Sequence, residues 1–232
     1  MKTIALLGKG LNNGTWQPVT ELLTQKGFNF QILNQYTELA NNQLIGILLG
    51  YDKIVPEDFI SKPKNGLLLF HSSDLPEGKG WAPIYYTMSN KKNELVQTLL
   101  YAHKSVDSGN ILAKAKYPLL GNEIEQEVKN YDDQMTLALI NECLEDIISK
   151  LPLGQKQDAN KSKWWRRRSP EDSEIGINEN ISGLFDKLRS LPESAPAFFN
   201  YKGRSYRIDL SLYNKSDFSD FDINKLIIEK FY

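Results

Sequence analysis

Two histidines, His71 and His103, are the first candidates for acid–base chemistry in this chain. The histidine ring titrates near neutral pH, so it can take a proton from an attacking group. His71 follows four apolar residues and begins a stretch, residues 71–82, with no helical or strand pattern, whereas His103 lies near Asp107. A carboxylate can fix the tautomer of a histidine and stabilise its charged form. The residue types alone do not decide which histidine Asp107 supports.

The elements that must position His71 are typical of an α/β fold. Apolar or alternating runs predict strands over residues 3–7, 28–33, 44–49 and 67–70. Helical spacing predicts helices over residues 16–26 and from Pro56 onward. Strands that alternate with helices imply right-handed crossovers, and hence a Rossmann-like, mostly parallel sheet with flanking helices. Ligands of such sheets bind beyond the carboxyl ends of the strands, which is where His71 lies.

The chain after residue 82 adds further helices, a strand and a hairpin. The pattern predicts a short helix, a strand, two longer helices and a β-hairpin over residues 83–90, 95–101, 134–151, 178–191 and 197–210. A soft boundary near residue 151 divides the chain into a domain over residues 1–150 and a small α+β extension over residues 151–232 that ends in the hairpin. The acidic residues Glu123, Glu125 and Glu127 have no histidine partners, and we expect them on a solvated face.

Composition limits the classes of function. The formal net charge is -1, which gives no overall attraction to nucleic acid or to an anionic membrane. No apolar run approaches the roughly 20 residues that span a bilayer. Cys143 is the only cysteine, which excludes an internal disulfide and a cysteine zinc cluster and fits a reducing cytoplasm. We therefore expect a cytoplasmic protein with no metal, no nucleic-acid partner and no membrane partner.

Three segments together resemble one enzyme family. The first runs from His71 to Ile84 and the second from Asp107 to Ile111, while Gly50 to Pro56 lies upstream of both. They resemble the two signatures and the pterin-side segment of the formyltransferase family, which includes methionyl-tRNA, glycinamide ribonucleotide and sugar formyltransferases. The signature residues stand here as His71, Ser73, Leu75-Pro76, Gly80, Pro83-Ile84, Asp107, Gly109 and Ile111.

The resemblance implies specific roles in transfer of a formyl group from 10-formyltetrahydrofolate. His71 is then the catalytic histidine and Asp107 the aspartate that supports it. The residues expected to line the folate pocket are Tyr51, Lys53, Ile54, Ser105 and Val106.

One position departs from the family pattern. The family has an asparagine two residues before the histidine, and here that position is Leu69. An aliphatic side chain cannot donate a hydrogen bond to an oxyanion, and losing such a donor typically costs about 10²–10³ in rate. Either protonated His71 and a backbone amide or water replace it, or the enzyme is slow or inactive.

The last third resembles the sugar branch of the family. The stretch Arg167 to Ile175 is similar to the Arg-Pro-Glu-Asp segment of sugar formyltransferases, and the variants in the signature are similar to those of enzymes acting on pseudaminic-acid-type amino sugars. The run Lys161 to Arg168 contains two tryptophans and three arginines. Arginines suit a pyrophosphate and tryptophans can stack on a base, although a solvated basic turn with buried tryptophans explains the same run. The residues expected to bind a nucleotide-linked amino sugar are Lys79, Trp81, Trp164, Arg166, Arg168 and Phe198.

Sugar formyltransferases are often homodimers, so we expect residues 151–232 to contribute to sugar-nucleotide binding or dimerisation. The runner-up is a methionyl-tRNA formyltransferase, a branch that usually has a larger, basic C-terminal domain. A third reading is a folate- or nucleotide-binding homologue without turnover, which Leu69 keeps open.

Overall fold

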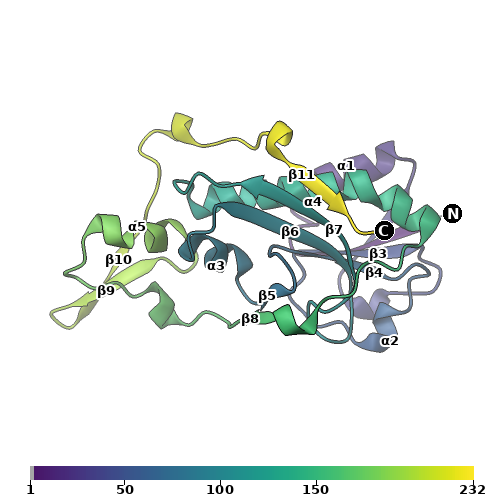
Figure 1. Ribbon diagram of the computed structural model, residues 1–232, viewed down its shortest axis with the longest axis horizontal. Helices are drawn as coiled ribbons and strands as arrows, with labels where there is room; N and C mark the ends of the chain where they lie inside the picture. The colour runs from purple at the N-terminus through teal and green to yellow at the C-terminus, as the bar shows by residue number, and fades with distance from the viewer. Residues whose placement is uncertain (1–2) are drawn as a thin grey trace.

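A seven-stranded sheet with the strand order β11-β7-β6-β4-β3-β1-β2 organises the molecule (Figure 1). The computed structural model describes residues 3–232. The pairings of β1 with β2 and β3, and of β3 with β4, are parallel, whereas β4–β6, β6–β7 and β7–β11 are antiparallel. Five strands (β2, β1, β3, β4 and β7) therefore run in one direction, which confirms the mostly parallel sheet. The strands are β1 Thr3–Gly8, β2 Asn29–Leu33, β3 Ile45–Leu49, β4 Leu67–His71, β6 Glu94–Tyr101, β7 Ile111–Pro118 and β11 Ile227–Lys230.

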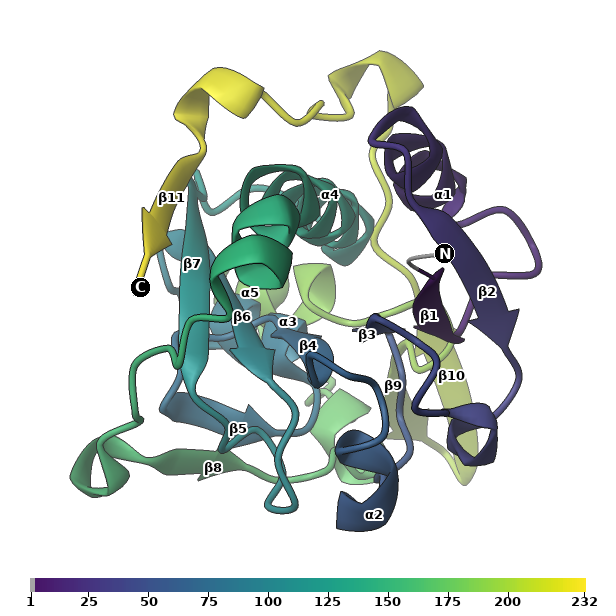
Figure 2. The same cartoon turned by 90° about the vertical axis from the view of Figure 1, so that its right-hand side faces the viewer.

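Helices cover both faces of this sheet because its central strands are apolar on both sides. All five residues of β3 are buried. The helices α1 (Gln17–Gln25) and α4 (Glu125–Lys150) pack on one face, and the short α2 (Glu57–Ile60) lies on the other (Figure 2). The short helix α3 (Pro83–Ser89) packs against α4. The helices expected near residues 16–26, 83–90 and 134–151 are thus confirmed, the last beginning earlier than predicted.

The expectation that the acidic series lies on a solvated face is wrong for two of its members. Glu123 and Glu127 are 3% and 2% exposed. Glu123 accepts hydrogen bonds from the backbone N–H groups of Leu120 and Gly121, and Glu127 accepts one from that of Ile124. Backbone donors at the start of a helix have no partner within the helix, so carboxylates that accept from them are stable when buried.

The prediction that residues 71–82 contain no helix or strand is wrong. Residues Glu77–Gly80 form β5, which pairs in parallel with β8 (Lys163–Trp165) from the second half of the chain. The segment Glu-Gly-Lys-Gly has no intrinsic preference for a strand, so only the long-range pairing with β8 makes it one.

The extension forms a small lobe and then returns to the main sheet. The lobe contains α5 (Ile181–Arg189) and a hairpin of β9 (Ala197–Tyr201) and β10 (Arg204–Ile208), as expected. The hairpin is not the last element, because β11 follows it and pairs with β7. The buried guanidinium of Arg189 connects the lobe to the rest of the molecule, because it donates hydrogen bonds to the backbone oxygens of Glu123 and Met88.

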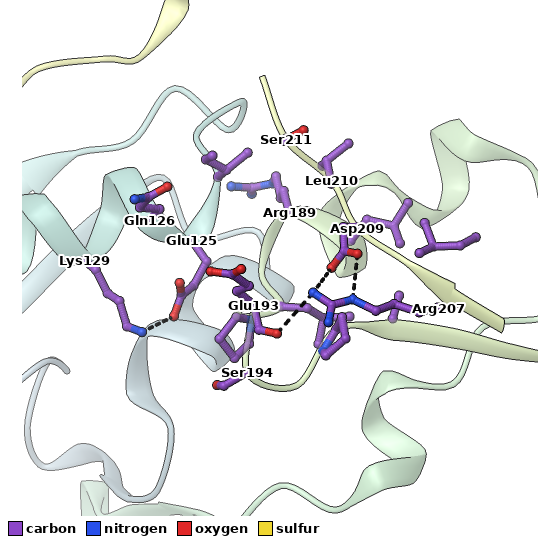
Figure 3. Close-up of a pocket in the computed structure, with 17 residues that line it drawn as sticks. Glu125, Gln126, Lys129, Arg189, Glu193, Ser194, Arg207, Asp209, Leu210 and Ser211 are labelled. Atoms are coloured by element: carbon purple, nitrogen blue, oxygen red, sulfur yellow. Dashed lines mark hydrogen bonds and ion pairs between the residues drawn. The ribbon is translucent and has the colours of Figure 1, made fainter. Parts of the chain in front are cut away.

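A groove of about 660 Å³ lies where the lobe meets the start of α4 (Figure 3). Two ion pairs lie along it: Lys129 lies 2.8 Å from Glu125, and Arg207 lies 2.6 Å from Asp209. This groove is lined by none of the candidate site residues. Within residues 3–232, no helix is both long and apolar enough to cross a membrane.

Candidate active site

His71 is the last residue of β4, which holds its ring at the carboxyl end of a buried parallel strand. The residue is 8% exposed. Its Nε2 lies 2.7 Å from the backbone oxygen of Gly78, and a carbonyl can only accept a hydrogen bond. In the neutral ring Nε2 therefore carries the proton, which leaves the lone pair on Nδ1 as the base.

Gly78 can present its carbonyl to His71 because it has no side chain. Its φ is 83°, in the left-handed region. A Cβ at this position would lie 2.6 Å from the ring of Trp165 and 2.8 Å from Cβ of Ser73. Trp165 belongs to β8, so the tautomer of His71 depends on a strand from the second half of the chain.

Asp107 faces the other ring nitrogen of His71. Its Oδ2 lies 3.6 Å from Nδ1, and the two side chains are 7% and 9% exposed. The same oxygen accepts a hydrogen bond of 2.9 Å from the backbone N–H of Gly80, also on β5. When Nδ1 takes a proton, the positive charge thus forms beside a carboxylate that is already held in place. Asp107 is thus placed to stabilise a charged His71 ring, while the Gly78 carbonyl fixes the tautomer of the neutral ring.

A cavity of about 350 Å³ opens in front of this pair. Four of the five expected folate residues line it, namely Tyr51, Lys53, Ile54 and Val106, together with Leu69 and Trp81. Ser105 lies next to Val106, and its N–H donates to the ring of His103 at 3.2 Å. The Tyr51 hydroxyl is buried and has no hydrogen-bond partner among the residues described, and burial raises its pKa. A ligand with a polar edge would satisfy that hydroxyl.

The residues expected to bind the sugar nucleotide are only partly brought together. Trp81 and Trp164 are exposed at 49% and 60%, and Trp164 pairs with Lys79 in the register of β5 and β8. Lys79 is 6% exposed and donates to Ser108 Oγ at 3.0 Å, away from solvent, and its burial lowers its pKa. Phe198 lies on β9, where its backbone oxygen accepts from the N–H of Ile175 in the lobe.

The two arginines expected to bind the nucleotide, Arg166 and Arg168, are occupied by contacts within the protein, whereas Arg167 between them is not. Arg166 makes a two-point contact with Asp172 at 2.8 and 2.6 Å, which lowers the pKa of Asp172 to about 2. Arg168 lies over the ring of Tyr85 and donates to Ser173. Arg167, which was not among the residues expected to bind the sugar nucleotide, is exposed, and its guanidinium lies 5.1 Å from the Trp81 ring. It has no carboxylate partner in the part of the chain that the structure describes.

A buried carboxyl behind the site was also missed from the sequence. Ser72 donates to Asp132 Oδ2 at 2.8 Å, and Oδ1 of Asp132 has no partner within residues 3–232. Burial raises the pKa of Asp132 to about 7, although the bond from Ser72 opposes that change. The residues around Asp132 in the sequence give no sign of its burial. It could have been predicted only from a contact between α4 and the loop after β4.

Asp132→Asn is expected to flatten the dependence of stability on pH. The folded state holds the proton of Asp132 up to about pH 7, whereas the unfolded chain releases it near 3.8. The folded state therefore binds more protons between these values, and stability falls as the pH rises through them, by on the order of 4 kcal/mol in all. Urea denaturation of both proteins between pH 5 and 8 measures this slope. Asp146→Asn, which removes a half-buried carboxyl whose pKa is lowered by Lys150 on the same helix, should keep the wild-type slope in this pH range. An equal slope in Asp132→Asn would contradict the assignment.

Comparison with known proteins gives the family. The formyl transferase family model matches residues 17–140, which are 124 of the 232 residues and more than half of the chain. The chain belongs to the formyltransferase family. Among the curated relatives of this formyltransferase chain, the methionyl-tRNA formyltransferase of Pediococcus pentosaceus is 30% identical over 179 residues. The match covers 75% of this chain and 55% of that protein, so the chain spans about half the length of the curated relatives it matches.

Solved structures share the fold of this formyltransferase chain at low identity. A sugar N-formyltransferase from Shewanella sp FDAARGOS_354 has a TM-score of 0.74 at 16% identity, over 91% of this chain and 98% of that one. HypX from Aquifex aeolicus, in complex with tetrahydrofolic acid, has a TM-score of 0.77 at 15% identity, over 90% of this chain and 37% of that one. Within the described residues 3–232 of the formyltransferase chain, no group of three or more His, Cys, Asp or Glu side chains could hold a metal ion.

Proposed function

We propose that this chain transfers a formyl group from 10-formyltetrahydrofolate to the primary amine of a nucleotide-linked amino deoxysugar, of the pseudaminic-acid type. The observation that carries the proposal is the buried His71–Asp107 pair at the head of a cavity whose rim carries the exposed Trp81. A base, a charge-stabilising carboxylate and a pocket for the donor are what formyl transfer to an amine needs.

The reaction follows from the placement of the two ring nitrogens of His71. The amine nitrogen attacks the formyl carbon, and Nδ1 takes the proton that this nitrogen loses. The bond between the formyl carbon and N10 of the folate then breaks, and the same proton passes to N10, so that tetrahydrofolate leaves. Asp107, 3.6 Å from Nδ1, stabilises the imidazolium that exists between the two transfers.

Leu69 shapes how the oxyanion is stabilised. Its side chain lines the same cavity as His71, where the family pattern has an asparagine. A leucine offers no donor, so protonated Nδ1 of His71 becomes the charged donor nearest the reacting carbonyl. The cost of the missing donor is of the order of 10²–10³ in rate, which makes a slow enzyme the expected result.

The acceptor site is proposed beside β5 and β8. Trp164 and Trp81 expose their rings there, and Arg167 supplies a guanidinium without a carboxylate partner in the described part of the chain. Aromatic faces stack on nucleobases, and arginine binds pyrophosphate oxygens with two parallel hydrogen bonds. Lys79 and Arg166, engaged by Ser108 and Asp172, position this surface instead of contacting the nucleotide.

Trp164→Ala is expected to raise the KM for the nucleotide sugar and to leave kcat nearly unchanged. Stacking of a base on an aromatic ring contributes about 1–3 kcal/mol, which corresponds to roughly 5- to 150-fold in KM. Steady-state kinetics at saturating formyl donor measure both constants. Tyr213→Ala removes a fully exposed ring elsewhere and should change neither; a loss confined to kcat would remove Trp164 from acceptor binding.

The assay that tests the proposal combines 10-formyltetrahydrofolate with a panel of UDP- and dTDP-linked 4-amino-6-deoxy sugars, read by mass spectrometry. A gain of one formyl group on one sugar supports the proposed reaction and identifies the acceptor. No product on any sugar, together with formylation of methionyl-tRNA, would support the second candidate. The methionyl-tRNA formyltransferases among the relatives favour that candidate, whereas the near-neutral charge of this chain argues against a tRNA surface.

A further inference from the structure

The loop that carries Asp107 is held in an unfavourable backbone conformation. Asp107 has a φ of 51°, in the left-handed region that residues with a Cβ rarely adopt. Gly109, two residues on, packs so tightly that a Cβ there would lie 1.7 Å from the backbone oxygen of Tyr101. Left-handed residues persist where the surroundings hold them, so some contact must fix Asp107.

That contact comes from Gln157, 50 residues further along the chain. Its Nε2 donates to the backbone oxygens of Asp107 and of Gly109, both at 2.8 Å. Its Oε1 is buried and has no partner among residues 3–232. The reversed amide would place that oxygen against two carbonyl oxygens, so the donors set the orientation. The amide of Gln157 therefore hydrogen-bonds the loop even though its own oxygen loses a partner, and an unpaired buried acceptor costs free energy.

The segment that precedes Gln157 is also hydrogen-bonded to the end of this loop. The backbones of Ile111 and Gln155 exchange two hydrogen bonds of 2.8 Å, and Asn110 donates to the backbone oxygen of Leu153 at 2.8 Å. Gln157 is the residue whose bond reaches Asp107 itself. It lies outside the part of the chain that the family model matches.

We propose that Gln157 is a positioning residue, one that holds Asp107 in the left-handed conformation from which its carboxylate meets both His71 Nδ1 and Gly80 N–H; its kinetic consequence rests on the proposed function. Without the two amide donors, Asp107 can relax towards ordinary backbone angles, which turns the carboxylate away from His71. A displacement of about 1 Å of a catalytic group can cost on the order of 10²-fold in rate.

The first measurement needs no activity. Gln157→Met keeps the length of the side chain and removes its donors. We expect faster hydrogen–deuterium exchange in residues 105–111 of this variant, and wild-type exchange in Lys156→Met, which alters an exposed neighbour. Wild-type exchange at residues 105–111 in Gln157→Met would overturn the proposal, whatever reaction the protein catalyses.

The second measurement tests whether Gln157 affects the reaction through Asp107. In the wild-type background, Gln157→Met should lower kcat by about 10- to 100-fold, with little change in the KM of the formyl donor. In an Asp107→Asn background the same substitution should cost less than about twofold, because the group it positions is already impaired. Equal losses in both backgrounds would show a merely structural role and overturn the proposal. A wild-type protein with no turnover would count against the proposed function alone, since the exchange data stand independently.

Discussion

His71→Asn is expected to abolish measurable formyl transfer, with kcat falling by about 10³ or more, because no other group can take the proton from the amine. The asparagine amide ends at the level of Nδ1, so the bond to the Gly78 oxygen is lost, while pairing with β8 still holds β5 in place. Binding of folate should stay within a few-fold of wild type, since the ring forms only part of the cavity wall. Single-turnover kinetics with excess enzyme, and fluorescence titration with 5-formyltetrahydrofolate, measure the two quantities.

His103→Asn provides the contrast for this result. The His103 ring is exposed at the edge of the cavity and accepts only the N–H of Ser105. We expect this variant to retain kcat, although its affinity for folate can change. Near-normal turnover in His71→Asn, or loss of turnover only in His103→Asn, would exclude His71 as the base and reverse the choice between the two histidines.

Asp107→Asn should cost nearly as much, about 10²–10⁴ in kcat, with the protein still folded. Asparagine tolerates the φ of 51°, and its Oδ1 can accept the N–H of Gly80, so the loop keeps its shape and loses its charge. Asp107→Ala would remove the charge and also strain the backbone at this φ, so its loss of rate would combine two effects. The missing charge no longer stabilises the imidazolium that forms during proton transfer.

The control for Asp107→Asn removes a carboxylate of a different kind. Asp209 is exposed and paired with Arg207 in the groove of Figure 3. Asp209→Asn should leave kcat and KM as in wild type, because a surface ion pair contributes little. If Asp107→Asn loses less than about tenfold while His71→Asn loses everything, the imidazolium needs no carboxylate and the proposed pairing is wrong.

The sequence determined the part of this protein that local patterns encode. Buried strands must be apolar on both faces, so the runs that became β1, β3 and β4 could be recognised without any partner. The end of such a run marks the edge of the sheet, so His71 could be placed at the edge where open α/β sheets bind their ligands. The same applies to α1 and to the hairpin of β9 and β10, whose spacing and turn residues are local signals.

Only the tertiary structure decided what surrounds His71 and Asp107. Glu77–Gly80 became a strand because β8 pairs with it from more than 80 residues away, and this strand supplies both the carbonyl that fixes the tautomer of His71 and the N–H that holds Asp107. Gln157 and Asp132 gained their roles in the same way, and Glu127 became buried instead of solvated. A polar side chain can be buried only where its hydrogen-bond partners come together, and chain closure brings those partners from distant positions that no local pattern records.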